Sequence, residues 1–268
     1  VTDVQPRKAT VSLGSNEEDE LPDINKYPLS VTGKGDLDIE IFATSEKAGN
    51  GNDGGLNEMA EAFNKEKKKV GDKTVSISVR PIAYGLGMDY IISGKYLPDA
   101  FTPSNELWGK IIESKGVKIK LAEKRLVGNV AGILLTKDKQ DLIIEKYGSV
   151  NMKTITQATA DNEIIMGYTN PFASATGLNF LISTLNSYDP SDPFSDEAVS
   201  GFEAFQVNVP FVAYTTLQMR DAADSGVLNG MILEYQTYTN TRELKDYTFT
   251  PFGVRHDNPV YAIGEQSK

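Results

Sequence analysis

The residues of this sequence that could do chemistry are hydroxyl-bearing and acidic side chains that directly follow apolar stretches. Thr44 and Ser45 follow an alternating apolar stretch, Ser174 and Thr176 follow a short buried run, and Glu234 ends another. Hydroxyls and unpaired backbone N–H groups at the starts of helices bind small polar or anionic molecules through hydrogen bonds. This chemistry is recognition of a small molecule, without any need for bond making.

The residue counts argue against catalysis. The chain has no cysteine, which excludes thiol nucleophiles, zinc–thiolate sites and disulfides. Its single histidine, His256, lies in a polar turn at 254–259, where an exposed loop position is expected. No two carboxylates have a spacing that fixes a general acid and base. We therefore expect a protein that is not an enzyme and that needs no cofactor and no metal.

Charge and hydropathy limit the kinds of partner that the protein is expected to bind. The chain of 268 residues carries 27 basic and 37 acidic residues, a net charge of −10, so a broad surface for nucleic acid or anionic lipid is not expected. No apolar run approaches the roughly 20 residues that cross a bilayer. A small, locally recognised solute is the remaining partner class.

The order of strands, polar loops and helices predicts an α/β fold. Each apolar strand is followed by a polar loop and then by apolar residues spaced three and four apart, which indicate one face of a helix. The expected strands are 37–42, 75–79, 99–102, 130–135, 164–168 and 230–234. Repetition of this unit predicts mainly parallel sheets flanked by helices.

The chain divides into two lobes on this pattern. Residues 1–36 are rich in acidic residues, Pro, Ser and Gly and are predicted to form a linker or tether. The first lobe is predicted to contain 37–127 plus 249–268, and the second 128–248. Crossings near 126–129 and 248–251 would form a hinge.

Small ligands of open parallel sheets bind beyond the carboxyl ends of the strands, where loops and helix starts meet. Ser174 and Thr176 have two interpretations, since each could cap its own helix or hold a ligand. Ser104 is expected to be the N-cap of the helix that follows it. The predicted ligand-binding residues are Thr44, Ser45, Tyr84, Ser104, Ser174, Thr176, Tyr214, Glu234 and Tyr235.

Four segments together resemble the type II extracellular solute-binding proteins. They are 37–45 (LDIEIFATS), 98–104 (PDAFTPS), 167–177 (GYTNPFASATG) and 226–235 (GVLNGMILEY), and the resemblance covers Leu37 to Ile263. The chain is most similar to the solute-binding module that stands upstream of von Willebrand factor A domains in Gram-positive surface proteins. It is more distantly similar to the molybdate and sulfate receptors of ABC importers.

The resemblance implies a periplasmic-binding-protein-like fold of two lobes, with a solute held between them by hydroxyls and helix starts. It implies an extracellular protein attached to the cell surface as a lipoprotein or by a membrane anchor. The expected partners are an oxyanion or small polar solute, and a membrane permease or a C-terminal von Willebrand factor A domain. A monomer is expected.

The sequence departs from the oxyanion receptors in its second loop, where Ala83, Tyr84 and Gly85 replace the usual hydroxyl. Glu46 and Glu234 flank the same cleft and would repel a dianion, which leaves a polar or cationic solute open. Helices that return to the first lobe in the family are missing after Ile263, and no apolar leader begins the chain. We therefore expect a processed piece of a longer polypeptide.

The alternative function is an adhesion or scaffold module at the cell surface that keeps the fold without a small ligand. The two hypotheses differ in whether the cleft binds any small molecule.

Overall fold

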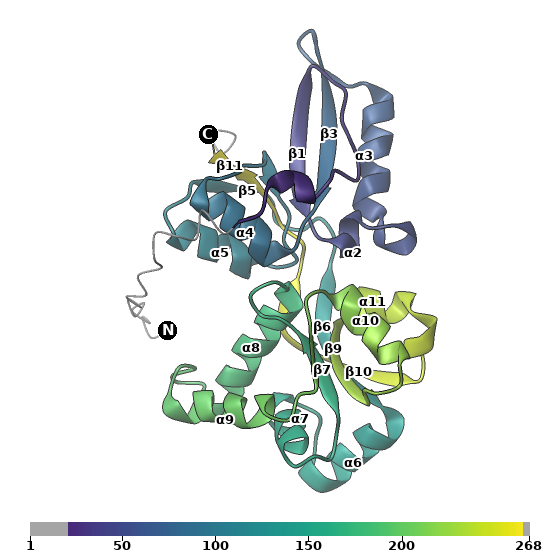
Figure 1. The fold of residues 1–268 in the computed structure, drawn as a ribbon, viewed down its shortest axis with the longest axis vertical. Coiled ribbons are helices and arrows are strands. Elements are labelled where there is room, and N and C mark those ends of the chain that lie inside the picture. The colour runs from purple at the N-terminus through teal and green to yellow at the C-terminus, as the bar shows by residue number, and fades with distance from the viewer. Residues whose placement is uncertain (1–20, 265–268) are drawn as a thin grey trace.

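The structure of the protein, a computed structural model, describes residues 21–264. Within that range the strands form two mixed sheets, one of six strands and one of five. Figure 1 shows the first sheet with its helices above and the second below, with the chain passing between them. Between residues 21 and 264, no helix is both long and apolar enough to cross a bilayer.

The first sheet is built around β1, whose alternating sequence pairs in parallel with β3 on one side and β4 on the other. The strand order is β2 (Lys69–Val70), β3 (Lys73–Pro81), β1 (Leu37–Ala43), β4 (Ala100–Phe101), β11 (Val260–Ile263) and β5 (Ile119–Glu123). Its helices are η1 (Ile24–Lys26), α2 (Ser45–Ala48), η2 (Gly51–Asp53), α3 (Gly55–Glu66), α4 (Tyr84–Ser93) and α5 (Glu106–Ser114). Phe42, Phe101 and Trp108 lie in its core.

The second sheet combines antiparallel and parallel pairs. Its strand order is β10 (Tyr247–His256), β6 (Asn129–Thr136), β9 (Gly230–Glu234), β7 (Met166–Thr169) and β8 (Phe211–Ala213). Its helices are α6 (Lys137–Tyr147), α7 (Met152–Ala160), α8 (Ala175–Tyr188), α9 (Asp196–Gln206), α10 (Thr216–Asp224), α11 (Tyr235–Asn240) and η3 (Arg242–Leu244). Tyr168, Phe180 and Phe205 pack together in its core.

Several helix starts have a side-chain cap, and one of the predicted caps is wrong. The hydroxyls of Ser174 and Ser195 accept hydrogen bonds from the first turns of α8 and α9. The prediction that Ser104 caps the next helix was wrong. Asn105 is the cap, and its Oδ1 accepts from the Leu107 N–H at 3.1 Å. Ser104 Oγ instead lies 2.9 Å from the Tyr84 hydroxyl.

The C-terminal part of the chain is shared between the sheets, whereas 249–268 was assigned to the first lobe. β10 pairs antiparallel with β6 in the second sheet, and β11 pairs with β4 and β5 in the first. The return crossing therefore lies at 257–259 and not near 248–251. β10 continues along β6 as far as the pair of His256 with Asn129, which carries it past the predicted crossing. Residues 265–268 lie outside the described range.

The structure describes only part of the predicted tether of 1–36, because residues 1–20 lie outside the described range. For 21–36 the prediction was wrong. Val31 forms a bridge with Val79 and is buried, and Tyr27 packs against the first core. Arg80 Nη1 donates to the Tyr27 carbonyl at 2.5 Å. The scattered apolar residues of this segment cover the first sheet.

Candidate ligand-binding site

A small cavity lies between the two lobes. Both lobes contribute its walls, which are formed by Thr44, Glu46, Ala83, Tyr84, Ala173, Ser174, Tyr214, Thr215 and Glu234. Its volume is about 10 Å³, close to the least space that one water needs. The lobes are therefore closed over the cavity, and a larger solute requires them to move apart.

Glu46, on α2 of the first lobe, contacts two helices of the second. The N–H of Thr216 donates to Glu46 Oε1 at 3.4 Å, and the Thr216 hydroxyl donates to the same oxygen. Gln236 Nε2 donates to the Glu46 carbonyl at 3.2 Å. In Figure 1, α2 lies at the edge of the first lobe that faces α10 and α11. One residue thus joins the lobes through both its side chain and its backbone.

Two further contacts join the lobes beside the cavity. The N–H of Gly85 donates to the Ala173 carbonyl at 3.3 Å, and a Cβ at Gly85 would lie 1.6 Å from the Phe172 carbonyl oxygen. Arg220 Nη1 forms an ion pair with Asp53 Oδ2 at 3.3 Å. The approach at Gly85 is so close that it leaves no room for any side chain.

The Glu46 carboxylate is buried, with 8% of the residue exposed. Its Oε2 has no hydrogen-bond partner among residues 21–264. Burial, and then the nearby Glu234 carboxylate, raise the pKa of Glu46. A buried carboxylate oxygen without a partner is costly unless a donor reaches it.

Glu234 lies across the cavity at the end of β9 and is fully bonded. Its Oε1 accepts from the Thr176 hydroxyl at 2.8 Å and lies 3.0 Å from His256 Nδ1. Asn129 Nδ2 donates to its Oε2 at 3.3 Å. Burial favours the neutral acid, yet the contacts with His256, Thr176 and Lys47 hold the pKa of Glu234 below its usual value. This carboxylate is a charged part of the cavity wall.

The prediction that His256 lies in an exposed loop was wrong. The residue ends β10 and its side chain is completely buried. Nδ1 faces Glu234, and Nε2 lies 3.2 Å from Asn179 Nδ2 on α8. Its polar sequence neighbours suggested a turn, whereas long-range pairing with β6 keeps the chain extended to this point.

Lys47 is a buried cation behind the cavity. Its Nζ donates to the Thr102 carbonyl at 2.6 Å, to the Thr102 hydroxyl at 3.1 Å and to Asn258 Oδ1 at 3.0 Å. Burial lowers the pKa of Lys47 to about 7, against the attraction of Glu234 and Glu46. Its amine is thus committed to the first lobe and to the crossing segment.

The structure places most of the predicted site residues at the cavity. Thr44, Tyr84, Ser174, Tyr214 and Glu234 line it. The other two buried hydroxyls lie one hydrogen bond behind its wall: Ser104 contacts Tyr84, and Thr176 contacts Glu234. Their role in holding a solute remains a prediction.

Two predicted residues lie elsewhere. Ser45 is the first residue of α2 and does not line the cavity. Tyr235 begins α11, is 50% exposed and packs edge-on against Phe249 at 5.2 Å. Tyr235 directly follows β9 and Ser45 follows β1 after one residue, yet each begins a helix and neither lines the cavity. Glu46 is the charged lining residue missing from the predicted ligand-binding set, although the sequence placed it as an acidic residue flanking the cleft.

At two of the helix starts near this region, those of α8 and α10, a hydroxyl bonds one of the protein's own acids. Glu234 accepts from Thr176 in the first turn of α8, and Glu46 accepts from Thr216 in the first turn of α10. A helix start attracts negative charge, and at α10 the Thr216 N–H also donates to Glu46, as it could to an oxyanion. The arrangement can accept hydrogen bonds more readily than it can bind an anion.

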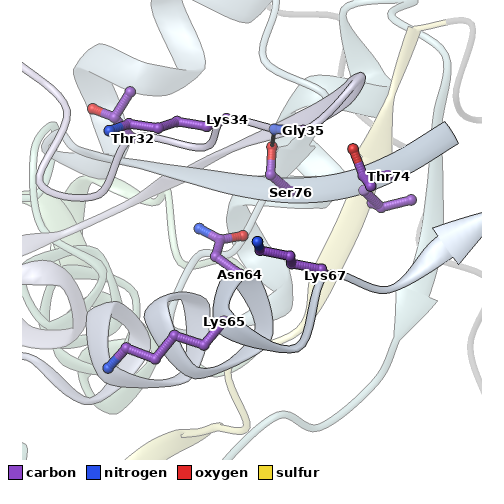
Figure 2. Close-up of a pocket in the computed structure, with 9 residues that line it drawn as sticks. Thr32, Lys34, Gly35, Asn64, Lys65, Lys67, Thr74 and Ser76 are labelled. Carbon is purple, nitrogen blue, oxygen red and sulfur yellow. Dashed lines mark hydrogen bonds between the residues drawn. The ribbon is translucent and has the colours of Figure 1, made fainter.

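A larger hollow lies on the first lobe, away from the lobe interface. It has a volume of about 520 Å³ and lies between residues 32–35, the end of α3 and β3 (Figure 2). Asn64 and Ser76 in its wall are used by the fold, since Asn64 bonds the backbone of Ile77 and Ser76 donates to Asp38. Its lysines are exposed, and Figure 2 shows Lys65 pointing away from the other labelled side chains. These features favour a surface groove without a specific ligand.

Residues 21–264 contain no group of three or more His, Asp or Glu side chains placed to hold a metal ion. The donor set between the lobes consists of two carboxylates, hydroxyls and one buried histidine.

No family model and no curated protein matches the sequence. Solved structures do match the fold. A periplasmic thiamin-binding protein aligns with a TM-score of 0.58 at 13% identity, over 89% of this chain and 76% of that one. The sulfate-binding protein SubI from Mycobacterium tuberculosis aligns with a TM-score of 0.57 at 13% identity, over 85% and 76%. This chain has the two-lobe fold of periplasmic binding proteins.

A third structure with this two-lobe fold is iron-bound HitA from Pseudomonas aeruginosa. It aligns with a TM-score of 0.56 at 12% identity, over 87% of this chain and 76% of that one. At such identities the likeness establishes the architecture, and the solute must be argued from this chain's own residues.

Proposed function

We propose that the protein is an extracellular solute-binding protein that captures a small polar solute between its lobes and closes over it. The observation that carries the proposal is the cavity itself: Thr44, Glu46 and Tyr84 from one lobe face Ser174 and residues beside it from the other. A site divided between two lobes is completed only when they close, which couples binding to a change of shape.

The two crossing segments supply a hinge for this movement. Residues 124–128 lead from β5 to β6, and 257–259 lead from β10 to β11. The crossings bond each other, since Arg125 pairs with Asp257 at 2.9 Å and Asn258 Nδ2 donates to the Val127 carbonyl at 2.8 Å. The pair can bend together while each sheet stays rigid.

Structures of this fold that bind sulfate, thiamin and iron support the same general class for this chain. Within that class we propose a monomer at the cell surface, held there as a lipoprotein or by a membrane anchor. Closure would signal to the permease of an ABC importer, or to an adjoining von Willebrand factor A domain of a larger Gram-positive surface protein. The proposal includes no catalytic step.

A solute screen tests the proposal. Thermal-shift measurements with oxyanions, amino acids, sugars and amines should find a compound that raises the melting temperature, because a ligand of the folded state stabilises it. Small-angle scattering should then detect a shape change on binding. Failure of every compound, together with an unchanged scattering profile, would contradict the proposal.

A matched pair of variants locates the site. Ser174→Ala and Ser195→Ala each remove an N-cap hydroxyl, from α8 and α9 respectively, and each should cost about 1 kcal/mol of stability. Only Ser174 lines the cavity. The affinity for the hit should fall in Ser174→Ala and stay unchanged in Ser195→Ala; equal affinities would move the site away from the cavity.

One observation favours the scaffold alternative. The cavity holds little more than one water, and Glu46 and Arg220 already join the lobes without a solute. A protein that uses these contacts to stay closed would serve as a rigid surface module. It would give no hit in the screen and the same scattering profile with every compound.

A further inference from the structure

We propose that the interlobe cavity takes the primary ammonium group of a small amine, with Glu46 as its principal acceptor. This inference rests on the proposed function and names the class of solute for it. Three features of the cavity carry it: an oxygen that lacks a donor, a wall without cationic groups, and two helix starts whose hydroxyls already bond acids.

The first feature is Glu46 Oε2. The two oxygens of this carboxylate have different surroundings, because Oε1 accepts from Thr216 and Oε2 has no partner in the described part of the chain. Only 8% of the surface of Glu46 is exposed, and the residue lines the cavity. A buried carboxylate oxygen without a partner, on a residue that lines a cavity, is satisfied by a donor placed in that cavity, and a charged donor gives the stronger bond.

The second feature is the charge of the wall. Among the lining residues, Glu46 and Glu234 are acidic and none is basic. The nearby cations have other partners: Lys47 Nζ donates to three oxygens, and Arg220 pairs with Asp53. A solute with positive charge is therefore attracted to the cavity, and one with negative charge meets two carboxylates.

The third feature is the use of the helix starts. An anionic solute that used the Thr176 or Thr216 hydroxyl would need to displace Glu234 or Glu46 from it. A cation needs no such displacement, because it can bond these carboxylates where they stand.

The shape of the cavity favours an ammonium group over a metal ion. The three N–H donors of an ammonium group find four candidate acceptors in residues of the wall: one carboxylate oxygen and the hydroxyl oxygens of Thr44, Ser174 and Thr215. An ammonium group is similar in size to the single water that the cavity has room for. Tyr214 lines the cavity and is 46% exposed, so the wall reaches solvent there and the rest of the solute can extend past it.

Calorimetric titration of the full chain tests the inference. The probes are methylammonium chloride, tetramethylammonium chloride, which has the same charge but no N–H donor, and sodium sulfate. Methylammonium should bind at least about ten-fold more tightly than tetramethylammonium, since only the former can donate to Glu46. Sulfate should not compete with it.

Glu46→Gln keeps the size of the side chain and removes its charge, and it should weaken methylammonium binding at least about ten-fold. Glu203→Gln, at an exposed position on α9, is the matched control and should bind as the wild type does. Glu46→Asp keeps the charge and should retain the preference for methylammonium over sulfate, which keeps the test decisive if the Gln variant does not fold.

The outcomes separate the two proposals. Sulfate binding without methylammonium binding overturns the ammonium inference and leaves the solute-binding function standing. Unchanged methylammonium affinity in Glu46→Gln also overturns the inference, because the site would then lie elsewhere. If no compound of any class binds and the shape never changes, both proposals fail.

Discussion

Five titratable side chains are buried together at the lobe interface: Glu46, Lys47, Tyr84, Glu234 and His256. Isolated burial of any one of them would strongly disfavour its charged form. Here Glu234 contacts His256 directly, and the electrostatic attraction of Lys47 also lowers its pKa. Within the described range Glu46 lacks such a partner at Oε2, which is why the proposed ammonium group is placed beside it.

Lys47 provides a pH test of this network. Its pKa falls from 10.5 in water to about 7 in the folded protein, mainly through burial. Between these values the unfolded chain binds a proton on Lys47 that the folded chain has released. This difference makes the unfolding free energy rise with pH, by at most about 1.4 kcal/mol per pH unit. Lys47→Met should remove this contribution when urea denaturation is measured at pH 7.5, 8.5 and 9.5.

Lys110→Met, at an exposed position on α5, is the control and should keep the slope of the wild type. The slope is the decisive quantity, because Lys47→Met also lowers stability at every pH by leaving the Thr102 and Asn258 acceptors without their donor. Equal slopes in Lys47→Met and the wild type would show that Lys47 is charged in the folded protein throughout this range.

At the scale of elements, the features that depend on neighbouring residues could be predicted from the sequence. The alternating residues 37–42 form β1, and the apolar residues spaced three and four apart within 55–66 form α3. Ser174 caps α8, which is one of its two predicted roles. The errors involve distant partners. β10 extends to His256 because β6 pairs with it, and 21–36 packs on a sheet whose strands come later in the chain.

The candidate site shows the same division. Residues at strand ends could be predicted to approach a common edge, and five of the nine line the cavity. Whether a side chain faces that cavity depends on the first turn of the following helix, which separates Thr44 from Ser45 and Glu234 from Tyr235. The importance of Glu46 comes from Thr216, 170 residues away, and local sequence contains no signal of that contact.

The start of α4 tests whether element packing permits closure. Gly85→Ala should favour the helix itself by about 1 kcal/mol, since alanine is the better helix former. Its methyl group would nevertheless collide with the Phe172 carbonyl oxygen, 1.6 Å from the Cβ position. We expect the lobes to stay apart, with a larger radius of gyration by small-angle scattering and at least about ten-fold weaker binding of the hit.

Gly55→Ala is the matched control, because its Cβ would meet nothing within 4 Å at the start of α3. It should leave the scattering profile and the affinity as they are in the wild type. An unchanged radius of gyration in Gly85→Ala would show that the lobes can close without so close an approach of Gly85 to Phe172.

At the scale of the whole molecule, the two sheets are joined by two short crossing segments. Asn258, in the second crossing, forms hydrogen bonds with the first lobe, with the other crossing and with the end of β10. Its Oδ1 accepts from Lys47 in the first lobe, and its Nδ2 donates to Val127 in the other crossing and to the His256 carbonyl at the end of β10. Its backbone N–H donates to the Ser104 carbonyl at 2.9 Å. One residue thereby relates the buried network to the hinge.

Asn258 also has a left-handed backbone conformation, with φ of 51°. Two substitutions therefore separate the contribution of its side-chain hydrogen bonds to protein stability from the contribution of its backbone conformation. Asn258→Gly removes the side-chain bonds and tolerates this φ, and it should cost about 2–4 kcal/mol in urea denaturation. Asn258→Ala should cost about 1 kcal/mol more, through backbone strain.

Asn162 is the control, since it is exposed and has φ of 60°. Asn162→Gly should therefore be nearly neutral, and an equally small effect of Asn258→Gly would mean that the crossings hold the lobes without its side chain.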